Sequence, residues 1–167
     1  MPRPAAPAAP DKRHVLSALR GAVREAVHRM TAVAKDTAEG ATHEEARSEG
    51  DKDMRATEQS YVARGQAMRA EDLADALAQL ERLEPPSFEQ RPLGAGALVE
   101  VDVEGERRWL FLSPVAGGTE VVVDGCRVLA VTPTSPVGRQ LVGKEPGDAF
   151  ELTLTGRLRE WTIERAW

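Results

Sequence analysis

Acidic side chains gather in one short segment of this chain, and carboxylates are hard oxygen ligands that can hold a divalent cation and orient a water molecule. Residues 36–53 contain seven acids and two bases, an excess of five that equals the net charge of −5 of the whole chain. The acids are Asp36, Glu39, Glu44, Glu45, Glu49, Asp51 and Asp53. The same composition is typical of a solvated loop. Whether these acids bind a cation or only face solvent depends on how the elements on either side position them.

The histidines, serines and the cysteine of the chain lack partners at a spacing that would predict a metal site or a catalytic nucleophile. The three histidines are His14, His28 and His43, which are fourteen and fifteen residues apart. None forms an i, i+4 pair with another, so their spacing predicts no metal site. Ser113 and Ser135 have no evident His/Asp partner for nucleophilic catalysis. The single cysteine, Cys126, lies in an apolar run, which predicts a buried side chain and a reducing, cytoplasmic setting.

Composition narrows the classes of protein further. The net charge of −5 argues against a general nucleic-acid binder, so we expect no independent sequence-specific DNA binding. No apolar stretch approaches the roughly 18–20 residues that span a bilayer, so we expect no membrane association. The first ten residues are rich in proline and alanine and lack the apolar core of a signal peptide. We interpret residues 1–10 as a disordered arm.

Two runs of residues carry a heptad pattern. In the first run the positions are Leu16, Leu19, Val23, Ala26, Met30 and Val33. In the second run they are Ala56, Gln59, Ala63, Gln66, Ala70, Leu73, Leu77 and Leu80. The alternating spacing of three and four residues is typical of a coiled-coil seam. Two such helices in one chain pack most simply as an antiparallel hairpin, which predicts a finger over 11–84 with its tip near 41–53, inside the acidic segment.

From residue 85 to residue 167 the period changes to two. Pro85 and Pro86 end the second helix, because neither can continue the hydrogen-bond ladder. Short runs then predict strands at 98–103, 109–112, 121–123, 128–131, 150–154 and 158–163, with turns near Gly105, Gly125 and Gly156. We therefore expect an α+β chain whose C-terminal domain, residues 85–167, is a small antiparallel sheet with one short helix.

That short helix lies in the most distinctive string of the chain, residues 132–152. Ser135 is a natural N-cap, and Pro136 fits the first helical position. Val137 and Leu141 lie one turn apart on the same face, and Gly143 can end the helix in the left-handed region. The string runs Ser-Pro-Val-Gly, then Leu-Val-Gly-Lys, then Gly-Asp. It resembles the signature in the C-terminal domain of the Gre transcription elongation factor family.

The resemblance extends over nearly the whole chain, because Gre factors also begin with an antiparallel coiled coil. It implies a C-terminal domain similar to the FK506-binding fold, and an accessory factor rather than an enzyme. The implied partner is bacterial RNA polymerase, with indirect contact to nascent RNA. The coiled coil would enter the secondary channel while the C-terminal domain grips its rim. The rim contact would fall on Ser135, Pro136, Val137 and Gly138, and the alternative that these residues only build the fold stays open.

The tip matches the Gre pattern incompletely. Residues 46–51 read Ala-Arg-Ser-Glu-Gly-Asp and resemble the family's Ala-Arg-x-x-Gly-Asp. This match would make Asp51 the first of two acids that help the polymerase's magnesium cleave backtracked RNA. The second acid normally follows three residues later, where this chain has Met54, and Asp53 lies one residue too early. On a helix that shift turns the side chain by about 100°. Asp51 could also simply cap the second helix.

The incomplete tip predicts polymerase binding with weak or absent stimulation of cleavage. The resemblance implies no cofactor of the chain's own, only Mg²⁺ shared with the polymerase through Asp51 and Asp53. A full transcript-cleavage factor is the close alternative. A coiled-coil adaptor and a prolyl isomerase are alternatives from other classes. The isomerase would need an apolar cleft lined by the few aromatic residues of this region, which are Trp109, Phe111, Phe150, Trp161 and Trp167.

Overall fold

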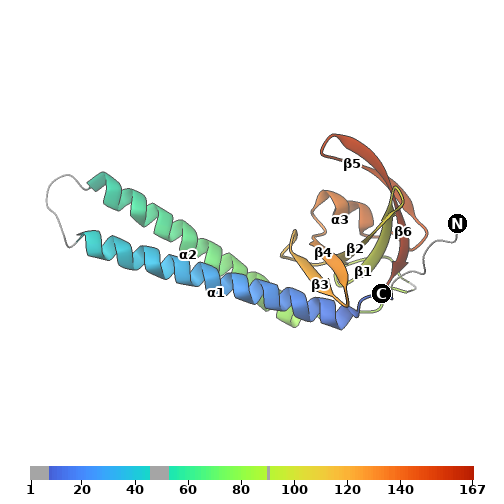
Figure 1. The fold of residues 1–167 in the computed structure, drawn as a ribbon, viewed down its shortest axis with the longest axis horizontal. Helices are drawn as coiled ribbons and strands as arrows, with labels where there is room; N and C mark the ends of the chain where they lie inside the picture. Colours follow the sequence, from blue (N-terminus) through green and yellow to red (C-terminus); the bar gives the residue numbers. More distant parts are fainter. Residues whose placement is uncertain (1–7, 46–52, 90) are drawn as a thin grey trace. The chain divides into compact units, whose positions relative to one another are not determined.

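The computed structural model describes residues 8–45, 53–89 and 91–167, with side chains described at 8–40, 58, 60–89 and 91–167. The chain is α+β, with a long helical region followed by a six-stranded mixed sheet (Figure 1). It divides into two compact units: Met1–Ala22 with Gln79–Trp167, and Val23–Ala78. The first turns of the first long helix and the last turn of the second therefore belong with the sheet.

The two long helices are α1, Lys12–Glu45, and α2, Asp53–Arg82. In the unit Val23–Ala78 the half-buried side chains follow one stripe on each helix. They include Ala26, Met30, Ala34 and Thr37 on α1, and Ala63, Gln66, Ala70, Leu73 and Leu77 on α2. Val33 departs from the predicted seam, because it is 45% exposed and Ala34 is covered instead. A straight helix drifts by about 20° per heptad against a strict 3.5-residue repeat, which moves the covered position by one residue.

The start of α1 is fixed by a cap and by burial. The Asp11 carboxylate accepts hydrogen bonds from the backbone N–H groups of His14 (3.2 Å) and Arg13 (2.7 Å). These bonds favour the charged form and hold the pKa of Asp11 below its usual value, that from His14 contributing most. Val15, Leu16 and Leu19 are all buried within the next two turns.

The end of α2 is joined to α1 through one arginine. Arg20 donates from Nε to the Leu80 carbonyl (2.9 Å) and from Nη2 to the carbonyls of Glu81 (3.2 Å) and Leu83 (3.1 Å). The last carbonyls of a helix have no partner within it, so Arg20 adds donors where the helix supplies none; the Leu80 carbonyl also accepts from the Leu83 N–H (3.2 Å). The helix stops at Arg82, shortly before the Pro85–Pro86 pair that predicted its end.

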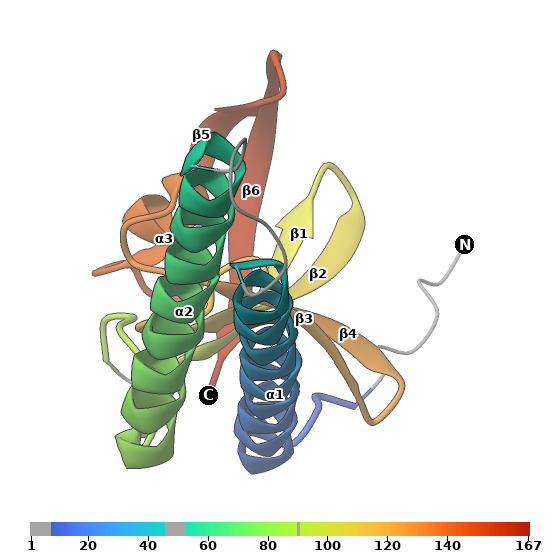
Figure 2. The ribbon, with the colours of Figure 1, turned by 90° about the vertical axis from the view of Figure 1, so that its left-hand side faces the viewer.

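The sheet consists of three hairpins. Its strands are β1 Leu98–Val103, β2 Glu106–Leu112, β3 Glu120–Val123, β4 Cys126–Val131, β5 Ala149–Leu154 and β6 Arg157–Ala166. Residues 104–105, 124–125 and 155–156 form the two-residue turns, each ending in glycine and each with both φ angles positive. This geometry matches the right-handed twist of the strands that it joins. Figure 2 shows the three hairpins, β1–β2, β3–β4 and β5–β6.

The prediction of a purely antiparallel sheet is wrong at one pair. The strand order is β3-β4-β2-β1-β6-β5, and β2 pairs with β4 in parallel, Trp109 opposite Val128 and Leu112 opposite Val131. The connection 113–119 carries the chain past the β4 position to the sheet edge, where β3 forms. The β3–β4 hairpin then brings β4 back beside β2 in the same direction. The alternation of side chains predicts strands but not which strands become neighbours.

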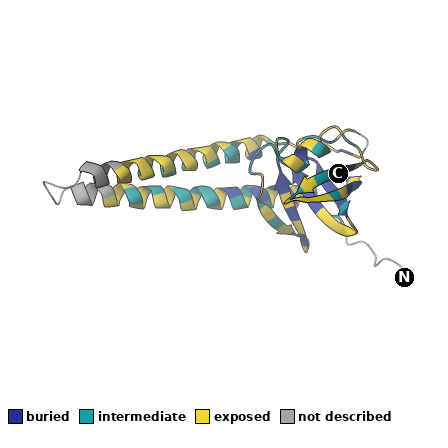
Figure 3. Ribbon diagram, turned by 90° about the horizontal axis from the view of Figure 1, so that it is seen from above, coloured by how far each residue is buried: buried dark blue, intermediate teal, exposed yellow. Residues whose placement is uncertain are grey.

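Apolar side chains are buried on both faces of the sheet. Figure 3 shows the strands coloured by burial. One face packs with the short helix α3, Pro136–Leu141, in a cluster that includes Val99, Val101, Leu110, Leu141, Phe150, Trp161 and Ile163. Since side chains alternate along a strand, Leu98, Trp109 and Phe111 point to the other face, where all three are buried. Cys126 is buried as predicted, with 8% of its surface exposed.

Candidate functional site

The segment 132–152 folds as its sequence predicts. Ser135 is the N-cap of α3, with φ −69° and ψ 157°, and its Oγ accepts a hydrogen bond from the Gly138 N–H at 3.0 Å. The same hydroxyl donates to the Thr132 carbonyl at 2.7 Å. Pro136 begins the helix, where its missing N–H leaves no bond unmade. Ser135 therefore uses both its donor and its acceptor capacity to hold the turn.

Glycine is required at position 138 because there is no room for a side chain, and not because the backbone has a positive φ angle. A Cβ added there would lie far inside van der Waals contact with the Thr132 carbonyl oxygen, 2.7 Å from the carbonyl carbon and 3.0 Å from Ser135 Oγ. The helix thus approaches the preceding loop as closely as a backbone allows. Together, Ser135 and Gly138 bind residues 132–138 into one compact turn.

The far end of the segment is tied to the linker that follows α2. Gly143, with φ 81°, donates its N–H to the Leu93 carbonyl (2.9 Å), and the Leu93 N–H donates to the Lys144 carbonyl (2.8 Å). In the next turn the Glu145 N–H donates to the Asp148 carboxylate at 2.9 Å. Through these bonds Gly143, Lys144 and Asp148 each help to hold the local fold.

The exposed side chains of the α3 turn are only partly those of the four predicted rim residues, whose contact with a partner stays a prediction. Pro136 is exposed, Ser135 and Val137 are half-buried, and Gly138 is buried. Arg139 and Val142 are exposed beside Pro136, Val142 to 45%. The predicted rim contact does not include these two residues, although the helical period identifies them, since they lie opposite the face that Val137 and Leu141 direct to the core.

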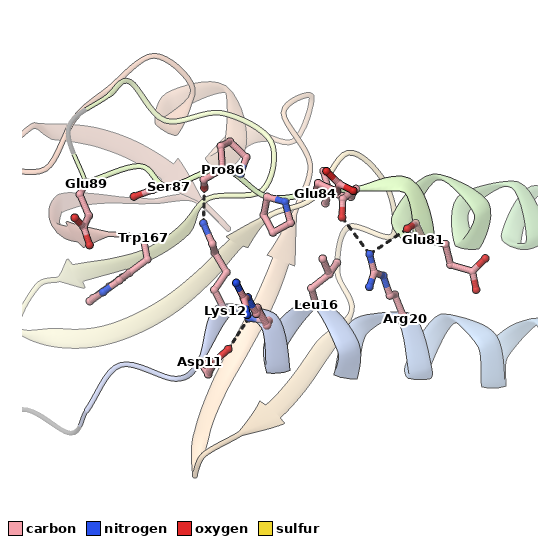
Figure 4. Close-up of a pocket in the computed structure, with 13 residues that line it drawn as sticks. Asp11, Lys12, Leu16, Arg20, Glu81, Glu84, Pro86, Ser87, Glu89 and Trp167 are labelled. Atoms are coloured by element: carbon pink, nitrogen blue, oxygen red, sulfur yellow. Dashed lines mark hydrogen bonds between the residues drawn. The ribbon is translucent and has the colours of Figure 1, made fainter.

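A hollow of about 1040 Å³ lies between the start of α1, the linker after α2 and Trp167 (Figure 4). Two of the cations that line it, Lys12 and Arg20, make contacts within the fold. The Lys12 ammonium donates to the Pro86 carbonyl (2.5 Å) and lies 5.3 Å from the Phe88 ring centre, and burial lowers the pKa of Lys12. The guanidinium of Arg20 is occupied by helix carbonyls. The arrangement contains no nucleophile with an adjacent base among the residues that line it.

The predicted catalytic and metal-binding residues are not tested by the geometry. Asp51 lies outside the described residues, and Asp53 is described only as the first residue of α2, without its side chain. In the described part of the chain no group of three or more His, Cys, Asp or Glu side chains is placed to hold a metal ion. Within the same described part, no helix is long and apolar enough to cross a membrane.

The aromatic residues of the sheet unit do not converge on one cleft. Phe150 and Trp161 stack at 5.9 Å in the cluster beneath α3. Trp109 and Phe111 point to the opposite face, where Trp109 and Trp167 lie 5.4 Å apart. The aromatics that a prolyl isomerase would gather are therefore divided by the sheet.

Comparison with known proteins gives distant structural neighbours. No protein-family model matches the chain, and no curated protein sequence matches it. The transcription factor Gfh1 is 19% identical with a TM-score of 0.40, over 89% of this chain and 93% of that chain. Gfh1 of Thermus thermophilus, a GreA factor homolog, is 21% identical with a TM-score of 0.36, over 89% and 94%. The GreA/GreB elongation factor of Nitrosomonas europaea is 23% identical with a TM-score of 0.36, over 56% and 78%. Values of this size do not establish a family.

Proposed function

We propose that this chain is a Gre-like regulator of transcription elongation that binds bacterial RNA polymerase. The observation that carries the proposal is the 132–152 string, with its Ser-Pro-Val-Gly turn and its Gly-Lys and Gly-Asp parts, placed after two long heptad helices. The distant likeness to Gre-type factors agrees with this proposal but does not carry it. The protein would act as an accessory factor on the polymerase's own chemistry.

The detailed proposal assigns a task to each part. The helices form an antiparallel coiled coil that enters the secondary channel, and the sheet unit, similar to the FK506-binding fold, grips the rim. The half-buried stripes on α1 and α2 support the first assignment, because a helix pair covers one stripe on each partner. We assign the rim contact to the α3 turn, with Pro136, Arg139 and Val142 as the side chains that reach the partner.

Binding to core RNA polymerase is expected at micromolar concentration or tighter. Replacing two exposed residues, as Arg139→Glu with Val142→Asp, should weaken the binding at least about tenfold, because a central contact typically contributes a few kcal/mol. Fluorescence anisotropy of the labelled full chain measures the affinity. Arg127→Glu is the matched control, since Arg127 is an exposed arginine on β4. Absence of binding by the unmodified chain would overturn the proposed function.

The bound finger is expected to stimulate RNA cleavage weakly or not at all. The reason is Met54 at the second acidic position, which leaves fewer oxygen ligands and a weaker field for a shared Mg²⁺ than a carboxylate pair would give. A transcript-cleavage assay on backtracked complexes compares the unmodified chain with Asp51→Asn, Asp53→Asn and Met54→Glu. We expect Met54→Glu alone to create activity. Strong cleavage by the unmodified chain, lost in either asparagine variant, would establish the full cleavage factor instead.

A further inference from the structure

An exposed stripe runs along α2 on the side opposite its half-buried stripe. We call it the outer stripe, and it consists of Tyr61, Arg64, Gly65, Met68, Asp72 and Asp75, all exposed. At 100° per residue these positions lie at least about 120° from the mean direction of the half-buried stripe. Tyr61 is 68% exposed and Met68 is 59% exposed. Of the eight large apolar side chains that are exposed in the described part of the chain, three lie at 61–68, so the apolar surface is concentrated here.

The charges of the outer stripe are not paired within the helix, in contrast to those of α1. On α1, Arg29 pairs with Glu25 (3.0 Å) and Lys35 with Glu39 (3.8 Å), each across four residues. On α2 no acid lies three or four residues from Arg64 in the sequence, and among the described residues Arg64 makes no ion pair. The next acid on the outer stripe follows eight residues later, about 12 Å along the helix axis. One helix cannot bring these two charges together.

The outer stripe is self-complementary about its central residue, Met68. Arg64 precedes Met68 by four residues, and Asp72 follows it by four. Tyr61 precedes Met68 by seven residues, and Asp75 follows it by seven. A second α2 that runs antiparallel, with Met68 on the two-fold axis, therefore places its Asp72 opposite Arg64 and its Asp75 opposite Tyr61. In such a symmetric contact every pair occurs twice.

We propose that the outer stripe is the contact between two copies of this chain, paired antiparallel about Met68. The two Met68 side chains bury each other, and each Arg64 guanidinium donates to the Asp72 carboxylate of the second copy. The Tyr61 hydroxyl donates to Asp75 of the second copy. Gly65 lies one turn from Met68 and has no side chain to hold the second helix away. This inference does not depend on the proposed function.

The mixture of charges on the outer stripe favours a second copy over other partners. A nucleic acid or an acidic protein would meet Arg64 but would be repelled by Asp72 and Asp75, and a basic protein would be repelled by Arg64. A second copy carries both signs in the reversed order, so each charge finds its opposite. Asp72 and Asp75 lie one turn apart, a like-charge spacing that weakens a single helix, and Arg64 of the second copy relieves it. Charges more than about 8 Å apart are largely screened at physiological ionic strength, so the net charge of −5 opposes pairing only weakly.

Charge reversal tests both the contact and its register. Sedimentation equilibrium of the full chain should show a monomer–dimer equilibrium with a Kd below about 1 mM. Arg64→Asp and Asp72→Arg should each weaken it at least about tenfold, because each places like charges opposite one another twice. The double reversal should restore the dimer, and an equimolar mixture of the two single variants should form a heterodimer. Arg29→Asp, on α1, is the matched control and should pair as the unmodified chain does. A monomeric unmodified chain, or no recovery in either the double variant or the mixture, would overturn the proposal.

A cysteine at the centre of the outer stripe gives a second, independent readout. A disulfide needs two Cα atoms within about 7 Å of each other, a distance that two copies reach only near the two-fold axis. Met68→Cys should therefore give a disulfide-linked dimer under mild oxidation. Ala67→Cys is the control, since Ala67 is exposed but turned by about 100° around the helix. Equal cross-linking of the two variants would contradict the proposed register.

Discussion

Replacement of Gly138 by alanine is expected to destabilise the sheet unit by about 4 kcal/mol, at the upper end of single-residue effects. The added methyl group would meet the backbone of Thr132, not the movable end of a side chain. Relief would require α3 to move away from residues 132–135. That movement would break the Ser135 cap and withdraw Leu141, which is fully buried, from the core. Urea denaturation followed by circular dichroism measures the loss.

Gly21→Ala is the matched control for this substitution. Gly21 also lies in a helix, but an added Cβ there meets nothing within 4 Å. Alanine is favoured over glycine in a helix interior by up to about 1 kcal/mol, so this variant should be slightly more stable than the unmodified chain. If both variants unfold at the same urea concentration, the close approach of α3 to Thr132 is not a constraint on the fold.

Arg107→Ala combined with Arg165→Ala is expected to lower stability by about 3–5 kcal/mol, because removing the partners of a buried ion pair leaves its charge uncompensated. The affected charge is the Glu100 carboxylate on β1, which is 2% exposed and lies 2.6 Å from Nε of Arg107 on β2 and 2.6 Å from Nε of Arg165 on β6. Adding Glu100→Gln to the double variant should recover more than half of the loss. With Glu100→Gln alone as a third variant, the free energies of unfolding of the unmodified chain and the three variants form a cycle that isolates the interaction.

An exposed pair provides the comparison. Arg127 lies 3.4 Å from Glu120, and both side chains are at least half exposed. Removing such a pair typically changes stability by less than about 1 kcal/mol, so Arg127→Ala should unfold almost as the unmodified chain does. A similar loss in Arg127→Ala and in the double alanine variant would show that burial of Glu100 does not set the effect.

The sequence predicts local structure well wherever short-range chemistry decides it. The turns at 104–105, 124–125 and 155–156 can be predicted because each ends in glycine, which adopts the positive φ of a two-residue hairpin turn without strain. The Ser135 cap and Pro136 start are readable for the same reason, since each acts within one turn of helix. The strands and α3 accordingly lie within a few residues of the predicted ranges.

What the sequence did not reveal depends on neighbours that are distant along the chain. The parallel pairing of β2 and β4 follows from the path of residues 113–119, which carry no pattern for it. Glu100 alternates with valines, as a solvent-facing residue would, and its burial depends on arginines from two other strands. Among the four predicted rim residues, two have packing roles that also depend on a residue outside the helix. The packing roles of Ser135 and Gly138 become visible only beside Thr132.

The membership of the sheet unit has a consequence for folding kinetics. Val15 and Leu19 are buried and belong to the same compact unit as the sheet, which begins at residue 98. Residues 23–78 therefore separate two parts of one unit along the chain. The closure entropy of this segment grows only with the logarithm of its length, so lengthening or shortening the helices should change equilibrium stability little. Contacts between residues so distant in sequence form slowly. The docking of the first two turns of α1 is therefore expected to be a late step in refolding, after the three hairpins have assembled.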